Sequence, residues 1–101
     1  YHLAESAFKE ALKYDPENPS LWNKLGATQA NSSRENGSKD AVYAYRNALE
    51  KKPNYVRAWV NMGISYANRK MYDLATKYYL KALTLNPNPN HIWSYLRLTL
   101  N

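Results

Sequence analysis

The hydrophobic positions of the chain follow one five-residue motif that occurs three times with identical spacing. In each copy an alanine is followed, at fixed offsets, by an aromatic residue, a second alanine, a proline and a tryptophan. The copies are Ala4-Phe8-Ala11-Pro16-Trp22, Ala41-Tyr45-Ala48-Pro53-Trp59 and Ala75-Tyr79-Ala82-Pro87-Trp93. Successive copies begin 37 and 34 residues apart. Because self-similarity at a period of about 20–50 residues is typical of repeat architectures, the pattern predicts a stack of similar units.

Each proline of the motif predicts the end of a helix, because proline cannot continue a helix and pushes the preceding residue out of the helical region. Asn18 can cap the next helix with Pro19 in its first turn, and Asn54 and either Asn88 or Asn90 are later cap candidates. No stretch shows the alternation of a strand. We therefore expect an all-α chain of about six antiparallel helices, at 2–14, 19–31, 38–51, 55–68, 71–85 and 90–100.

The small residues of the pattern predict close contacts between helices. A larger side chain than alanine would hold two crossing helices apart, whereas the aromatic residues fill the space between neighbouring pairs. Gly26 and Gly63 each lie four residues after a tryptophan of the motif. Because a glycine inside a helix costs about 1 kcal/mol relative to alanine, we expect each of them to let the two helices of one repeat touch.

The interval of 34 residues is the period of the tetratricopeptide repeat (TPR), which the motif resembles. The longer interval holds three extra residues, and aligning Trp22 and Gly26 with Trp59 and Gly63 places them in the polar segment 31–38. Both ends of the chain are out of phase with the repeat. This predicts a piece of a longer right-handed superhelix that can associate with itself through its ends. We expect a single helical-hairpin solenoid over 1–101, with the second helix of a partial repeat at 1–16, full repeats at 19–53 and 56–87, an insertion near 32–38 and a further helix at 90–101.

Composition adds little to this prediction. The 101 residues are enough for one small domain, and they include no cysteine, which excludes disulfides and Cys-type zinc sites. No apolar run reaches the roughly 18–20 residues of a membrane span. The net charge of +6 permits an acidic partner, but the charges are scattered, and we interpret most of them as solvated helix faces and helix ends.

Residues that carry catalytic or metal chemistry are sparse. His2 and His91 are far apart, and neither has a metal-ligand spacing. The three glycines stand alone, so no glycine-rich loop is present to hold a phosphate. The sequence therefore predicts a protein that is not an enzyme, with no catalytic residues, no metal and no cofactor.

Polar residues form one stripe on each of two predicted helices. Residues spaced i, i+4, i+8 and i+11 share a helix face. An amide offers donors and an acceptor, so it can pair with a peptide backbone or a carboxylate, and a small residue between two amides lets a ligand approach. In TPR arrays the first helix of each repeat lines a concave groove. The predicted groove stripes are Arg57-Asn61-Ser65-Asn68 and Asn23-Ala27-Asn31. The alternative is that these are ordinary surface amides, because asparagine is abundant in this chain.

Several segments resemble one particular TPR family, the receptors for type 1 peroxisomal targeting signals. The resemblance includes positions that do not serve packing, and it covers nearly all of residues 19–101. The segments are 21–28, 30–31, 41–42, 44–46, 55–57, 61–65, 68, 92–94 and 96–98.

The resemblance implies a receptor that binds cargo proteins ending in a tripeptide similar to Ser-Lys-Leu. It also implies a cytoplasmic protein that cycles to the peroxisome membrane and meets docking proteins there. The family recognises its ligand through groove asparagines and a basic residue near the ligand's carboxylate. The matching positions are Asn23, Asn31, Arg57, Asn61 and Asn68, with Lys24, Ala27, Ser65 and Ser94 as weaker candidates. Two departures from the family are the short linker at 86–90 and the three extra residues after Asn31.

Three other functions remain open from the sequence. A TPR adaptor of the chaperone-tail type would hold an acidic peptide with a lysine-rich groove, whereas these stripes are rich in amides. RNA binding is suggested only by the net charge, without a basic stripe and exposed stacking aromatics. A scaffold segment would bind no peptide at all.

Overall fold

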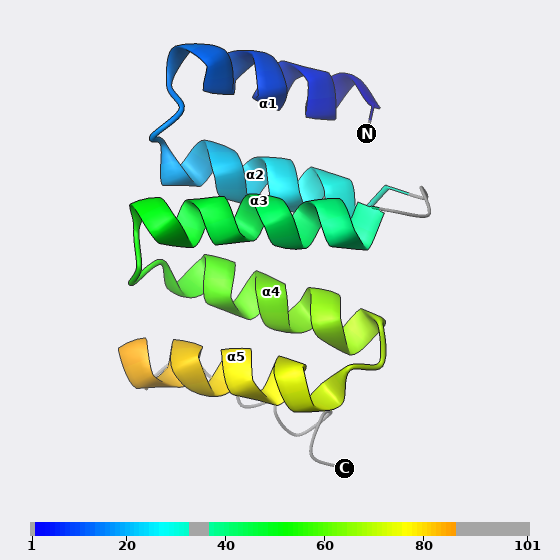
Figure 1. The fold of residues 1–101 in the computed structure, drawn as a ribbon, viewed down its shortest axis with the longest axis vertical. Coiled ribbons are helices and arrows are strands. Elements are labelled where there is room, and N and C mark those ends of the chain that lie inside the picture. Colours follow the sequence, from blue (N-terminus) through cyan, green and yellow to red (C-terminus); the bar gives the residue numbers. More distant parts are fainter. Residues whose placement is uncertain (1, 33–36, 87–101) are drawn as a thin grey trace. The chain divides into compact units, whose positions relative to one another are not determined.

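The computed structural model describes residues 2–32 and 37–86, and these residues form helices joined by short turns (Figure 1). The all-α prediction is confirmed, and four of the five observed helices differ from their predicted bounds by one residue at an end. The predicted helix at 90–100, with the cap candidates Asn88 and Asn90, lies outside the described residues. The helices are α1 (His2–Tyr14), α2 (Pro19–Ala30), α3 (Gly37–Lys51), α4 (Val56–Asn68) and α5 (Tyr72–Leu85).

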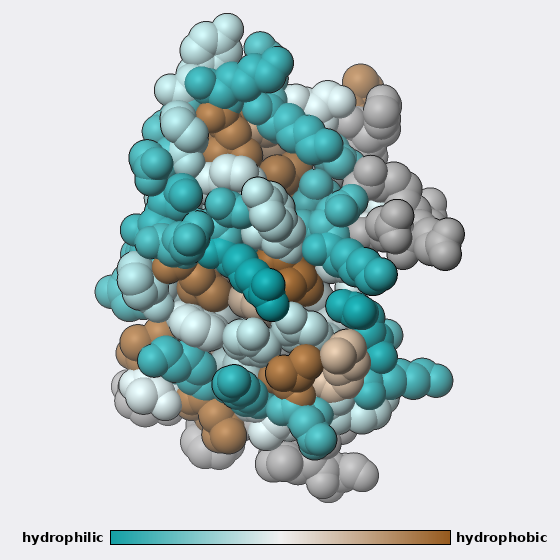
Figure 2. Space-filling model, in the orientation of Figure 1, coloured by the Kyte–Doolittle hydropathy of each residue, from teal (hydrophilic) through white to brown (hydrophobic). Residues whose placement is uncertain are grey.

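The chain divides into two compact units between Pro53 and Asn54. Unit 1 contains α1, α2 and α3, and unit 2 contains α4 and α5. Within each unit, successive helices pack against each other and run in opposite directions (Figure 1). Polar side chains cover much of the visible surface, and apolar side chains emerge between them (Figure 2).

Glycine makes the close helix contact in both units, as the sequence predicts. A Cβ atom added at Gly26 of α2 would lie 2.5 Å from Cε1 of Tyr45 on α3. A Cβ atom added at Gly63 of α4 would lie 2.6 Å from Cδ1 of Tyr79 on α5. Both distances are far shorter than van der Waals contact, so only glycine lets these tyrosine rings lie against the helix backbone.

The motif alanines behave differently in the three copies. The alanines of the second copy, and those of the third, are fully buried. In the first copy Ala4 is exposed and Ala11 is half-buried, and the expected crossing with the first helix of that partial repeat stays a prediction. Helix α1 packs on α2 and α3 through other residues: Leu12 is buried with Leu25 and Ala44, and Phe8 packs against this cluster.

The predicted start of α2 is confirmed. Asn18 Oδ1 accepts hydrogen bonds from the N–H groups of Ser20 (2.9 Å) and Leu21 (3.3 Å), and Pro19 is the first helical residue. The indole N–H of Trp22 donates to the carbonyl oxygen of Pro16 at 2.7 Å. The six-residue spacing of proline and tryptophan therefore ties the loop to the first turn of the helix in this copy.

The predicted cap of α4 by Asn54 is wrong. The N-cap position is occupied by Tyr55, which makes no side-chain cap hydrogen bond, and the helix begins at Val56. The carbonyl oxygen of Tyr55 accepts the first helical hydrogen bonds, from Ala58 (3.1 Å) and Trp59 (3.3 Å). Since a cap side chain serves the second or third residue beyond itself, Asn54 lies one residue too early.

The turn between α4 and α5 closes with two hydrogen bonds typical of a left-handed helix terminus. The N–H of Met71 donates to the carbonyl oxygen of Tyr66, and that of Lys70 to Ala67, both at 2.9 Å. This places Lys70 at φ 61°, a conformation that favours glycine.

Candidate functional site

The α2 stripe in unit 1 runs from a buried amide to an exposed one. Asn23 is only 5% exposed, although it is polar and lies in the helix interior. Ala27 is half-buried, and Lys24, beside Asn23, is exposed. The surface-amide interpretation therefore does not fit Asn23.

Asn31 is not inside a helix as predicted. Helix α2 ends at Ala30, and Asn31 is its C-cap: its backbone N–H donates to the carbonyl oxygen of Ala27, and that of Ser32 donates to Gln29, both at 3.2 Å. Its side chain is exposed. Its backbone stays helical at φ −85° and ψ −5° and its N–H still bonds four residues back, so the i+8 spacing from Asn23 holds at this C-cap position.

The α4 stripe in unit 2 is buried at its centre and exposed at both ends. Ser65 is 3% exposed and Asn61 is half-buried. Arg57, in the first turn, and Asn68, the last residue of α4, are both exposed.

The stripes therefore bring Asn61, Ser65 and Arg57 onto one helix, and Asn23 and Ala27 onto another. The use of both stripes by a single ligand stays a prediction, as does the role of each residue. Ser94 lies outside the described residues.

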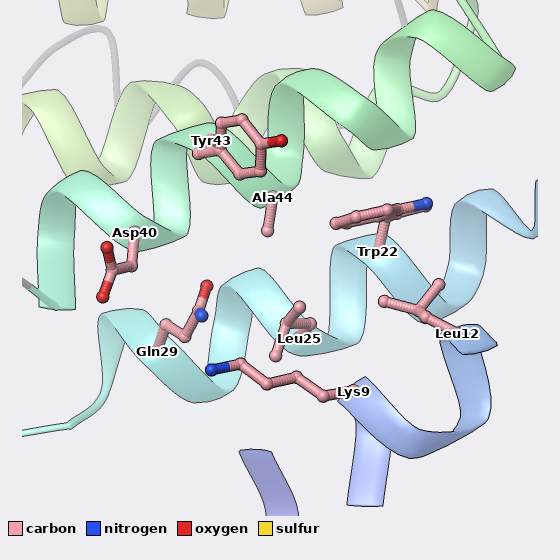
Figure 3. Close-up of a pocket in the computed structure, with 8 residues that line it drawn as sticks. All are labelled: Lys9, Leu12, Trp22, Leu25, Gln29, Asp40, Tyr43 and Ala44. Atoms are coloured by element: carbon pink, nitrogen blue, oxygen red, sulfur yellow. The ribbon is translucent and has the colours of Figure 1, made fainter. Parts of the chain in front are cut away.

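Sequence reasoning missed a pocket in unit 1. It has a volume of about 370 Å³ and lies among α1, α2 and α3 (Figure 3). At about 100° per residue, its α2 residues Leu25 and Gln29 lie on the side of the helix opposite Asn23 and Ala27. The lining residues are Lys9, Leu12, Trp22, Leu25, Gln29, Asp40, Tyr43 and Ala44.

Gln29 connects this pocket to a buried polar contact. It is 6% exposed, and its Nε2 donates to Oε2 of the buried Glu5 at 3.4 Å. The same carboxylate oxygen pairs with Nζ of Lys9 at 3.1 Å. Gln29 Oε1 is buried and has no hydrogen-bond partner.

In unit 1, the Trp22 ring meets the Tyr43 ring edge to face (centroids 6.5 Å apart), and Nζ of Lys51 lies 5.8 Å from the centroid of the Trp22 ring. Unit 2 carries a row of stacked rings instead. Tyr78 lies between Trp59 (centroids 5.7 Å apart, planes at 29°) and Tyr66 (5.3 Å, 7°). Nζ of Lys81 lies 5.7 Å from the centroid of the Trp59 ring, and the guanidinium carbon of Arg69 lies 6.0 Å from the centroid of the Tyr66 ring. Such pairs add stability beyond the area they bury.

Neither a metal centre nor a membrane span emerges from the described residues. Within residues 2–32 and 37–86, no group of three or more His, Cys, Asp or Glu side chains could hold a metal ion. The helices described here are also too short or too polar to cross a membrane.

Comparison with known proteins identifies the repeat. Residues 56–89 match the family model of the tetratricopeptide repeat. Over 79 residues, the chain is 42% identical to the peroxisomal targeting signal receptor of Candida glabrata and 44% identical to that of Candida albicans. Each match covers 78% of this chain, which spans only 13% of the length of these relatives. A more distant match is the human protein O-mannosyl-transferase TMTC1, 34% identical over 86 residues, with 84% of this chain and 10% of that protein covered.

Solved structures agree on the fold. The TPR domain of Arabidopsis OM64 superposes with a TM-score of 0.86 at 18% identity, covering 95% of this chain and 77% of that one. The first TPR of Spaghetti (RPAP3), bound to the HSP90 peptide SRMEEVD, superposes with a TM-score of 0.84 at 21% identity. The match covers 94% of this chain and 73% of that one. The chain therefore has the tetratricopeptide-repeat fold, its residues 56–89 match the family model of that repeat, and over 78% of its length its sequence is similar to peroxisomal targeting signal receptors.

Proposed function

We propose that the chain is part of a receptor that binds the C-terminal Ser-Lys-Leu-type tripeptide of peroxisomal matrix proteins. The observation that carries the proposal is the buried amide of Asn23 in a chain whose relatives are peroxisomal targeting signal receptors. The TPR fold and these relatives support a protein-interaction role, and they favour a non-catalytic protein. Cycling between cytosol and peroxisome membrane, with docking proteins as further partners, belongs to the same proposal.

The proposed mechanism is capture of a terminal carboxylate without any bond made or broken. Asn61 of unit 2 donates to and accepts from the main chain of the bound tripeptide, since an amide carries both functions, and Asn23 of unit 1 has the same capacity. Arg57 is exposed in the first turn of α4, where its guanidinium can reach the carboxylate directly or through water. Asn31 and Asn68 contribute from the helix ends.

The experiment is a fluorescence anisotropy titration with a labelled peptide ending in Ser-Lys-Leu. Asn61→Ala is expected to weaken binding by about 1–3 kcal/mol, or roughly 5- to 150-fold, because ligand polar groups lose their partners. Asn47→Ala is the matched control, because Asn47 lies on α3 and its Nδ2 donates to the carbonyl oxygen of Tyr43 in its own helix at 3.0 Å. Equal affinity of the wild type and Asn61→Ala would refute the assignment of Asn61.

The chaperone-tail adaptor is tested in the same titration. Its ligands are acidic, as in the HSP90 peptide SRMEEVD bound by the TPR of Spaghetti. The two stripes carry only Arg57 as a cation, which does not suit a strongly acidic peptide. We expect the acidic peptide to bind at least tenfold more weakly than the Ser-Lys-Leu peptide, whereas the reverse order would favour the adaptor.

A further inference from the structure

The two units can be compared residue by residue. Gly26 meets Tyr45 in unit 1 as Gly63 meets Tyr79 in unit 2. Positions on α2 therefore correspond to positions 37 residues later on α4, and positions on α3 to positions 34 residues later on α5. The same glycine–tyrosine contact fixes the alignment of the two units. A different residue at a corresponding position therefore reflects a real difference between the two repeats.

The row of rings in unit 2 has an incomplete counterpart in unit 1. Trp22 corresponds to Trp59, but Gln29 stands where unit 2 has Tyr66. Ala44 stands where unit 2 has Tyr78, the ring that is stacked between the other two. All three unit 1 residues line the pocket, and the methyl group of Ala44 points into it (Figure 3). The pocket therefore lies where a tyrosine ring is stacked in the other repeat.

The pocket has the size and the polarity for such a ring. Its volume of about 370 Å³ is well above the roughly 150 Å³ of an engineered cavity that binds benzene. The buried Gln29 Oε1 lacks a hydrogen-bond donor, and in Figure 3 it points toward the α3 side of the pocket. A buried acceptor without a partner is costly, so a ligand that brings a donor gains more than a purely apolar one.

We propose that this pocket binds the phenol side chain of a tyrosine supplied by a partner peptide. The ring stacks on Trp22, as Tyr78 stacks on Trp59 in unit 2, and its edge faces the amide of Gln29. The hydroxyl group donates to Gln29 Oε1, with a small rotation of the buried side chain. The site is on the side of α2 opposite Asn23, so it is independent of the targeting-peptide proposal.

The first test is an NMR titration of the chain with N-acetyl-tyrosinamide. A single side chain is expected to bind with a dissociation constant of about 1 mM. Ring-current shifts should appear at the Ala44 methyl group and the Gln29 side-chain amide. N-acetyl-phenylalaninamide should bind about 2- to 10-fold more weakly because it lacks the hydroxyl donor, and N-acetyl-leucinamide should cause no such shifts.

Two variants exchange the residues at the corresponding positions 44 and 78, and they test the comparison between the two repeats. Ala44→Tyr places a tyrosine ring in the pocket from the protein's own chain, so we expect it to abolish the Gln29 shifts. Tyr78→Ala opens the equivalent space in unit 2, so the same probe should now shift the Trp59 indole. Binding of the Ser-Lys-Leu peptide should be unaffected by Ala44→Tyr, which separates this site from the proposed function.

Several outcomes would overturn the proposal. One is that no localised shifts appear at tyrosine-probe concentrations up to 20-fold above the expected dissociation constant. The others are that the shifts persist in Ala44→Tyr, or that the leucine probe binds as tightly as the tyrosine probe. Equal binding of the tyrosine and phenylalanine probes would remove the role of Gln29. Shifts of the Ala44 methyl group that depend on protein concentration alone would identify a second copy of the chain as the occupant instead.

Discussion

At the scale of single residues, glycine and tyrosine determine how closely the two helices of a repeat approach. The sequence suggested this role for Gly26 and Gly63 from their spacing, and the structure identifies the partner rings as Tyr45 and Tyr79. The sequence pattern predicted these aromatic residues between neighbouring helix pairs, whereas their rings lie against the glycine within one pair.

Gly63→Ala is expected to destabilise the chain. The new methyl group would overlap the ring of Tyr79, and overpacking of this kind costs about 1–3 kcal/mol, against which the better helix propensity of alanine recovers about 1 kcal/mol. Chemical denaturation measures the change. Lys77→Ala, at an exposed position of α5, is the control and should change stability by less than about 0.5 kcal/mol.

Lys70→Gly is expected to stabilise the chain by about 1 kcal/mol. Lys70 has a positive φ of 61°, and a side chain in that region costs about 1–2 kcal/mol, part of which is offset by the greater freedom of glycine when unfolded. Thermal melting of Lys70→Gly is compared with that of Lys77→Gly, which places the same substitution in the interior of α5. Lys77→Gly should destabilise the chain by about 1 kcal/mol. A lower melting temperature for Lys70→Gly would contradict the left-handed turn.

The buried hydroxyl group of Tyr45 is expected to lower the free energy of unfolding at high pH. Burial raises its pKa from 10.0 to about 12, because the ring hydroxyl resists ionisation in the interior. The unfolded state therefore binds fewer protons between pH 10 and 12, and the free energy of unfolding falls by up to about 1.4 kcal/mol per pH unit in that window. Denaturation of wild type and Tyr45→Phe across this range measures the effect. The variant should lose less stability, and parallel curves would contradict the assignment to Tyr45.

At the scale of the elements, the sequence predicted the helices better than their ends. Asn18 and Asn54 both precede a helix, yet only Asn18 caps one, because Pro19 fixes where α2 begins. Helix α4 has no proline at its start and begins one residue later than predicted. Asn31 is at the C-cap for a similar reason, since the end of α2 depends on a turn whose conformation the helical spacing does not encode.

The two asparagines provide a matched test of helix capping. Asn18→Ala should destabilise the chain by about 1 kcal/mol, because the N–H groups of Ser20 and Leu21 lose their acceptor. Asn54→Ala should change stability by only a few tenths of a kcal/mol, since Asn54 is exposed and does not occupy the N-cap. Equal losses in denaturant unfolding for both variants would contradict this difference.

At the scale of the whole molecule, the repeat spacing predicted the architecture, because the motif alanines and tyrosines of the second and third copies are all buried. The same spacing did not reveal the pocket, which arises where Ala44 and Gln29 replace the tyrosines of the other repeat. The candidate ligand residues were only partly predictable. Asn23 and Ser65 are buried in their helices, whereas Asn31 and Asn68 lie at exposed helix ends.

The central claim is recognition of a free C-terminus by the amide stripes. The most direct measurement is isothermal titration calorimetry with two peptides that end in Ser-Lys-Leu and differ only in a terminal carboxylate or carboxamide. We predict that the carboxylate peptide binds at least about tenfold more tightly, since charge-assisted hydrogen bonds are roughly twice as strong as neutral ones. Equal affinity for the two peptides, or no binding of either, would contradict the account.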